Sequence, residues 1–310
     1  MSGLSRKLFG LLSNRNIILI LALSLGLFWG QGVQWTEMLV IPALAFVMML
    51  STTSIKGKLF RSPGIWLKPA MTGLFLNYVI LGGLIIILSN LLPLEEHYRT
   101  GYLILAAVPP AVGVIPFTSI LNGDVEFSLI GCLTCYIGAF ITIPLMFSTV
   151  LGISFEFQSQ LIITLVELIL IPLLLSRFLL YSGLASRIEP VRGVLTNWSF
   201  FIVIYTVVGV NRDVFFSQPL SLLPAAILTI MTTYLLGYII EKVGKMLRTN
   251  PQQVTSMLLL GTSKNAGFSA GLALTLFGKK TAIPITVQTV MMLSYIIFLD
   301  LQKSRKRDIN

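Results

Sequence analysis

The sequence predicts an all-α membrane protein with ten transmembrane helices. Its 310 residues are 55% hydrophobic and 11% charged, whereas soluble domains carry about 25% charged residues. Long apolar runs such as YVILGGLIIILSNLL at 78–92 do not alternate polar and apolar residues. In lipid the backbone must satisfy its own hydrogen bonds, so such runs predict helices rather than the strands of a barrel.

Each predicted span is an apolar run long enough to cross a hydrocarbon core of about 30 Å. The first run follows basic residues as in a signal peptide, but no small-residue cleavage site comes after it, so we expect a retained helix. The ten predicted spans are 14–31, 36–53, 66–92, 101–121, 127–151, 159–182, 192–211, 217–241, 253–277 and 281–301.

Lysine and arginine predict the orientation of these spans. With the N-terminus placed in the cytoplasm, alternate loops collect 17 basic residues on the cytoplasmic side and 4 on the outer side. This asymmetry predicts a plasma (inner) membrane protein with both termini cytoplasmic. It also explains the net charge of +10 as a topology signal, so nucleic acid is not an expected partner. Lys264 belongs to neither side.

The ten spans divide into two halves of five, which an odd number of spans makes inverted relative to each other. We expect a first repeat at 1–152, an inverted repeat at 153–302 and a basic cytoplasmic tail at 303–310. The fourth span contains Pro109, Pro110 and Pro116, and the ninth contains several glycines and Asn265. Interrupted helices at matching places in inverted halves predict a transport site near the membrane midplane. Kinks that serve only packing are the alternative.

Two stretches resemble a known family. VPPAVGVIPFTSILNGDVEFS at 108–128 and GTSKNAGFSAGLAL at 261–274 are similar to the fourth-helix and ninth-helix stretches of the bile acid:sodium symporter family. This resemblance implies two interrupted helices that cross near the midplane, and alternating-access transport of organic anions together with sodium.

The sequence departs from the family at the positions that hold sodium. The carboxylate and glutamine of the ninth-helix motif are replaced by Leu260 and Lys264, while Asn265 keeps the pattern. The position on the third helix that holds a glutamine in sodium-coupled relatives is Asn77. The resemblance maps the other sodium site onto Val114, Ile115, Ser128 and Cys132, of which only Ser128 offers a side-chain oxygen. Sodium, as a hard cation, prefers oxygen ligands, so we expect both sites to be lost and no metal to be bound.

Lys264 suggests a replacement for the bound cation. A lysine in mid-helix costs about 2.5–3.5 kcal/mol on insertion scales, so we expect it to have a partner or a function. Its ammonium would hold the crossing together and attract an anionic substrate. Glu167, in the apolar run of the sixth span, is the candidate partner. A desolvated lysine can also exchange a proton, which would make Lys264, Glu167 and Ser128 candidates for ion or proton coupling. A static ion pair that only fixes helix packing is the alternative.

The predicted function is a secondary transporter of a small organic anion, either a carboxylate or a bile-acid-like compound, that works by alternating access. We do not expect sodium coupling; a proton link, uniport and exchange remain open. The alternatives are a sodium-coupled symporter with altered sites, and a channel or sensor on a transporter scaffold. The sequence has a single histidine, His97, and none of the motifs of intramembrane hydrolysis, so we expect neither an enzyme nor a cofactor. The predicted substrate-binding residues are Lys264, Asn265, Thr262, Ser263, Thr118, Ser119 and Asn77.

Overall fold

The described part of the computed structural model comprises residues 14–53, 63–150, 152, 162–163 and 166–309. The regular elements among these residues are all helices, and the described residues contain no sheet. Six helices in them are long and apolar enough to cross a membrane. These six are Gly30–Thr52, Gly64–Leu91, Val125–Thr149, Leu184–Val210, Pro219–Met246 and Lys279–Gln302.

The other four predicted spans are not seen as single long helices. The first contains a helix of 14 residues, Arg15–Phe28, and the sixth lies partly outside the described residues. The runs 101–121 and 253–277 are each divided into two shorter helices. The length of an apolar run predicts that the segment can cross the membrane, but it does not show where the helix breaks within the run.

The described chain forms two compact units that do not coincide with the predicted halves. Unit 1 comprises 1–56 and 163–217, and unit 2 comprises 57–162 and 218–310. Each unit therefore takes one segment from the first half of the chain and one from the second. The predicted division into repeats at 152 and 153 concerns symmetry rather than compactness, and it stays a prediction.

Unit 1 is a helical bundle in which α12 packs along α2 and α4, and α11 packs against α4. The left-handed backbone of Gly183, with φ +74°, makes the turn between α11 and α12. The elements of unit 1 are α2 (Arg15–Phe28), η1 (Gly30–Gly32), α3 (Val33–Thr36), η2 (Glu37–Leu39), α4 (Val40–Thr52), η5 (Val166–Leu170), α11 (Ile171–Tyr181), α12 (Leu184–Val210) and α13 (Arg212–Ser217).

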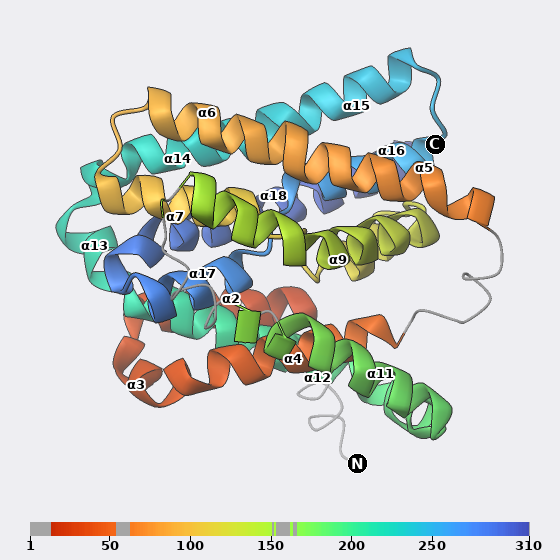
Figure 1. Ribbon diagram of the computed structural model, residues 1–310, viewed down its shortest axis with the longest axis horizontal. Helices are drawn as coiled ribbons and strands as arrows, with labels where there is room; N and C mark the ends of the chain where they lie inside the picture. Colours follow the sequence, from red (N-terminus) through yellow and green to blue (C-terminus); the bar gives the residue numbers. More distant parts are fainter. Residues whose placement is uncertain (1–13, 54–62, 151, 153–161, 164–165, 310) are drawn as a thin grey trace. The chain divides into compact units, whose positions relative to one another are not determined.

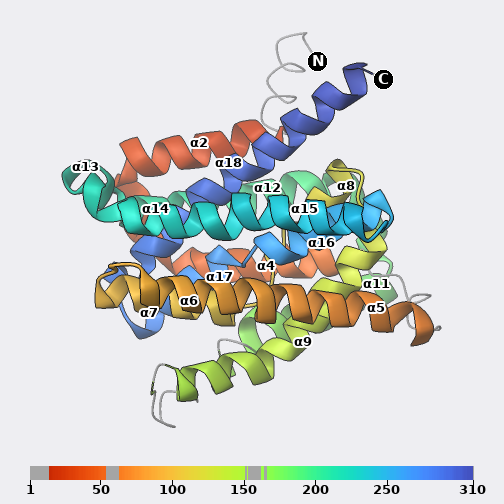
Figure 2. The ribbon, with the colours of Figure 1, turned by 90° about the horizontal axis from the view of Figure 1, so that it is seen from above.

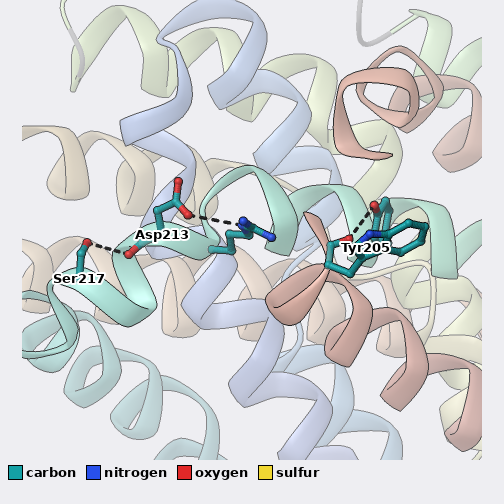
Figure 3. Close-up of polar contacts among 5 residues, drawn as sticks. Tyr205, Asp213 and Ser217 are labelled. Carbon is teal, nitrogen blue, oxygen red and sulfur yellow. Dashed lines mark hydrogen bonds and ion pairs between the residues drawn. The ribbon is translucent and has the colours of Figure 1, made fainter. Parts of the chain in front are cut away.

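A tyrosine near the end of α12 fixes the packing of this unit (Figure 3). The hydroxyl of Tyr205 donates to the carbonyl of Trp29 at 3.1 Å and accepts from the amide of Gly32 at 3.0 Å. Beyond α12, the Ser217 hydroxyl donates to the carbonyl of Asp213 at 2.7 Å within α13. A buried tyrosine hydroxyl requires such partners, and these two bonds connect α12 to the segment that follows α2.

Unit 2 is built around two long rods, each interrupted by a π-helical segment (Figures 1 and 2). The first rod is α5 (Pro63–Leu74), η4 (Phe75–Gly82) and α6 (Gly83–Leu91), and the second is η6 (Pro219–Leu222), α14 (Leu223–Ile230), η7 (Met231–Leu235) and α15 (Leu236–Met246). The remaining elements are α7 (Glu96–Ala107), α8 (Val114–Ile120), α9 (Val125–Thr149), α16 (Pro251–Thr262), α17 (Ala266–Leu276) and α18 (Lys279–Ile309).

The divided helices occupy the centre of unit 2. Every residue from Gly101 to Val114 is buried, as is almost every residue from Leu258 to Ala273. Figure 2 shows α16 between the α5–α6 rod and the α14–α15 rod, and α16 packs against η4, α15 and α9. The two interruptions therefore lie where protein rather than lipid surrounds the backbone, as their polar groups require.

Local sequence explains several helix ends in this unit. The Asp124 side chain caps α9 by accepting from the amide of Phe127 at 3.0 Å. The Asn250 side chain caps α16 by accepting from Gln252, with Pro251 at the first helical position. Both arrangements supply an acceptor for an amide that has no partner inside its helix. Gly278, with φ +88°, makes the turn from α17 into α18.

Candidate functional site

The two interruptions in unit 2 hydrogen-bond to each other. The first break is the segment 108–113 between α7 and α8, and the second break is the segment 263–265 between α16 and α17. Val108 follows α7 in an extended conformation, and Ser263 does the same after α16. Between the breaks, the amide of Ala111 donates to the carbonyl of Ser263 at 2.9 Å, and the amide of Asn265 donates to the carbonyl of Pro109 at 3.0 Å. Pro110 and Lys264 thus form an isolated antiparallel bridge. Each break thus satisfies one backbone amide and one backbone carbonyl of the other.

The side chain of Lys264, whose backbone forms this bridge, is completely buried. Its nitrogen Nζ donates to the carbonyl of Ala106 at 2.7 Å, to the carbonyl of Val108 at 2.9 Å and to Oδ1 of Asn77 at 2.9 Å. An ammonium has three N–H donors, so these three oxygens match its capacity. Within the described part of unit 2, Lys264 forms no ion pair with a carboxylate.

Two of the three acceptors belong to the C-terminal end of α7. Helix ends leave carbonyls without intrahelical partners, and the aligned peptide dipoles make this end partially negative. The continuing chain cannot supply the missing donors, because Pro109 and Pro110 have no backbone N–H. Lys264 therefore acts as the cap of α7, which compensates part of the cost of a buried charge.

The third acceptor, Asn77, lies in the π-helical segment η4. Its side-chain nitrogen donates to the carbonyl of Leu260 at 3.1 Å, so Asn77 connects the ammonium to the last turn of α16. The ring of neighbouring Tyr78 lies under the ammonium, 4.8 Å from Nζ to the ring centroid, and an aromatic face attracts a cation at this distance. π-Helical segments often occur at functional sites.

Three consecutive carbonyls of the first break each have a different donor. The carbonyl of Val108 accepts from Lys264 Nζ, that of Pro109 from the amide of Asn265, and that of Pro110 from the hydroxyl of Tyr136 at 2.7 Å. Tyr136 lies in α9 and is buried. Sequence reasoning did not select Tyr136 or the backbone acceptors. A buried tyrosine in an apolar helix signals a hydrogen-bond partner, but backbone carbonyls carry no signal in the sequence.

Asn265 uses its whole side chain inside the protein. Its Oδ1 accepts from the amide of Phe268 at 3.0 Å, which caps α17, and its Nδ2 donates to the Tyr136 hydroxyl at 3.3 Å. The amide of Ala266 donates to the carbonyl of Lys264 at 2.9 Å. These bonds use the amides of Ala266 and Phe268 at the start of α17.

The remaining predicted contacts fall into three situations. The Thr262 hydroxyl donates to the carbonyl of Leu258, and the hydroxyls of Thr118 and Ser128 bond to each other at 2.7 Å. Ser119 is exposed near the end of α8. The hydroxyl of Ser263 is buried and has no hydrogen-bond partner among the described residues. Ser263 is therefore the predicted contact with unused hydrogen-bonding capacity.

Apolar side chains or a thiol occupy several of the positions that the resemblance assigned to the ligands of the two sodium ions. Leu260, Val114 and Cys132 are buried, and the Leu260 side chain packs on Gly131 of α9. Cys132 and Cys135 are free thiols. Among the described residues, no group of three or more histidine, cysteine or acidic side chains could hold a metal ion.

Glu167, the predicted partner of Lys264, lies in η5 of unit 1, and its side chain is exposed. Groups within unit 2 already take all three donors of the Lys264 ammonium. The ammonium therefore does not need Glu167 to satisfy its hydrogen bonds, and the pairing of these two residues stays a prediction.

The six long apolar helices among the described residues suggest an integral membrane protein. In unit 2, the two hydrogen-bonded breaks are buried among these helices. A family-wide profile described as the Sodium Bile acid symporter family (SBF) matches residues 38–218, more than half of the chain. The chain belongs to this family, as its motifs predicted, and membership suggests a secondary transporter. The match includes the first break and ends before Lys264. A search among curated proteins found no match.

Proposed function

We propose that this protein is a secondary transporter of a small organic anion in which the ammonium of Lys264 replaces a mobile cation. The observation that supports this proposal is the set of three oxygens around Lys264 Nζ, at 2.7–2.9 Å. Oxygen ligands of this kind suit a hard cation, and here a covalently attached cation takes them. A fixed cation cannot cross the membrane with the substrate, so transport proceeds without sodium.

The proposal includes ten spans in two inverted repeats, with the fourth and ninth spans crossing near the midplane. Two regularities support the repeats. Each compact unit combines the corresponding segments of both halves, 1–56 with 163–217 and 57–162 with 218–310. The π-helical segments η4 and η7 also lie in the third span of each half. The distribution of basic residues supports cytoplasmic termini in the plasma membrane.

The substrate site proposed here lies on the side of the second break opposite Lys264. In an extended segment, successive side chains point to opposite sides, so Ser263 and Asn265 lie across the backbone from the ammonium. Ser263 supplies a hydroxyl that has no partner among the described residues, while Lys264 attracts the anion electrostatically rather than by direct contact. This arrangement favours an anion with hydrogen-bonding oxygens, such as a carboxylate.

The test is transport into proteoliposomes by the purified protein, with radiolabelled cholate and pyruvate as a large and a small carboxylate. We expect saturable counterflow of at least one probe, with the same initial rate when potassium replaces sodium. Stimulation by an inward sodium gradient would contradict the proposal and support a sodium symporter with altered sites. Stimulation by a proton gradient would indicate that Lys264 exchanges a proton. Flux without counterflow would indicate a channel, and binding without flux a sensor.

Pairing between Lys264 and Glu167 is tested separately with Glu167→Gln. If the pair couples the two units during transport, this variant transports more slowly at unchanged expression. An unchanged rate would leave Lys264 as the cap of α7 and remove Glu167 from the mechanism.

A further inference from the structure

Tyr136 joins three elements of unit 2 through one hydroxyl group. The tyrosine belongs to α9, its hydroxyl donates to the carbonyl of Pro110 in the first break, and it accepts from Nδ2 of Asn265 in the second break. The two bonds measure 2.7 Å and 3.3 Å. A hydroxyl has one donor and two acceptor positions, so the donor and one acceptor position are used here, each on a different break.

The bond to Pro110 satisfies a carbonyl that the local backbone leaves without a helical partner. Pro110 lies in the extended segment between α7 and α8, and its neighbour carbonyls at Val108 and Pro109 accept from Lys264 and Asn265. Without the Tyr136 hydroxyl, a buried carbonyl would lose its donor, at a cost of about 1–3 kcal/mol. Tyr136 thus completes the set of donors that holds the first break open.

The bond from Asn265 determines which way its side-chain amide points. A tyrosine hydroxyl whose hydrogen is already used in the bond to Pro110 can only accept a hydrogen bond from a second neighbour. The Nδ2 group of Asn265 must therefore face Tyr136, which leaves Oδ1 to cap α17 at the amide of Phe268. The same hydroxyl fixes the carbonyl of one break and the side chain of the other.

We propose that Tyr136 is a positioning residue of the crossing, the place where the two breaks hydrogen-bond to each other. Tyr136 holds Asn265 and the second break, including Ser263, in the orientation that the substrate meets. This inference rests on the proposed function for its effect on transport, but not for its effect on the crossing itself. A phenylalanine at this position keeps the ring packing and removes only the hydroxyl.

The experiment compares Tyr136→Phe with Tyr102→Phe. Tyr102 is a suitable control because it is also fully buried in unit 2, and its hydroxyl bonds to the carbonyl of Ala225 and to Thr229, both in α14. Each variant loses one buried tyrosine hydroxyl, but only Tyr136→Phe removes a link between the breaks. Both are purified in lipid nanodiscs with the wild-type protein.

The first measurement is amide hydrogen exchange of the two breaks without any substrate. In Tyr136→Phe we expect exchange of the amides of Ala111 and Asn265 to rise about fivefold, since loss of one hydrogen bond makes local opening easier. In Tyr102→Phe these two amides should exchange as in the wild type. Equal exchange at the breaks in both variants would overturn the proposal.

The second measurement is counterflow of the transported carboxylate probe. We expect Tyr136→Phe to raise KM about tenfold with little change in maximal rate, because the binding surface is disordered while the helices remain assembled. A KM equal to that of Tyr102→Phe, despite faster exchange at the breaks, would also overturn the positioning role. If the wild-type protein carries neither probe, the proposed transport function fails, and the exchange comparison still decides whether Tyr136 holds the crossing.

Discussion

The Nζ atom of Lys264 lies 2.7 Å from the carbonyl oxygen of Ala106, although 158 residues separate them in the sequence. This contact joins the second break of unit 2 to the C-terminal end of the helix before the first break. A side chain from one broken helix therefore caps the other. The positive charge that is unusual in an apolar run meets the negative end of a helix dipole.

The first prediction concerns the stability that Lys264 provides. Lys264→Met removes the donor from three buried oxygens, at about 1–3 kcal/mol for each. It also relieves the cost of burying a lysine, about 2.5–3.5 kcal/mol on insertion scales. The first effect is the larger, so we expect a lower Tm in thermal unfolding in detergent. A Tm equal to or above that of the wild type would show that the ammonium does not stabilise the crossing.

The second prediction concerns the space beside the ammonium. A Cβ atom on Gly82 would lie 3.1 Å from the carbonyl oxygen of Ala106 and 3.8 Å from Lys264 Nζ. We expect Gly82→Ala to displace this acceptor, lowering both Tm and the transport rate. Gly83→Ala is the matched control, because a Cβ atom there meets nothing within 4 Å and alanine is a better helix former than glycine. Equal behaviour of the two variants would contradict the close packing around Lys264.

The third prediction separates substrate contact from structure at the second break. Ser263→Ala removes a hydroxyl without a partner among the described residues, so it should leave Tm unchanged or slightly raised. If Ser263 binds the substrate, KM for the carboxylate probe rises by about tenfold, the loss expected for one hydrogen bond to a charged group.

Thr262→Val is the control for Ser263→Ala. The Thr262 hydroxyl is equally buried, but it bonds to the carbonyl of Leu258 in its own helix. We expect its KM to match the wild type. A larger change in KM for Thr262→Val than for Ser263→Ala would place the substrate elsewhere.

Much of the fold could be predicted because lipid imposes a strong pattern on the sequence. The apolar runs around 66–92, 127–151 and 281–301 correspond to α5–α6, α9 and α18. The ends differ by one to three residues, except that α18 continues to Ile309, eight residues beyond the apolar run. The start of α12 at Leu184 could not be read from hydropathy, since its first turns carry Arg187 and Arg192. A helix can continue past the apolar part of its sequence, and hydropathy follows only that part.

The site was only partly predictable, for a physical reason. Lys264 and Asn77 stood out because polar side chains are rare in apolar runs, and the structure brings them to 2.9 Å. The carbonyls of Ala106 and Val108 could not be selected, because every residue has a carbonyl and only tertiary structure decides which ones lack a helical donor. Asn265 was expected to meet the substrate, yet both ends of its amide are already used.

Sodium dependence of Lys264→Gln is the most direct test of whether a fixed ammonium replaces a mobile cation. Counterflow of the transported probe is measured in sodium and in potassium, with the exposed lysine variant Lys242→Gln as control. We predict that Lys264→Gln transports poorly in potassium or acquires a dependence on sodium, while Lys242→Gln behaves as the wild type in both media. Normal transport by Lys264→Gln in both media would contradict the replacement.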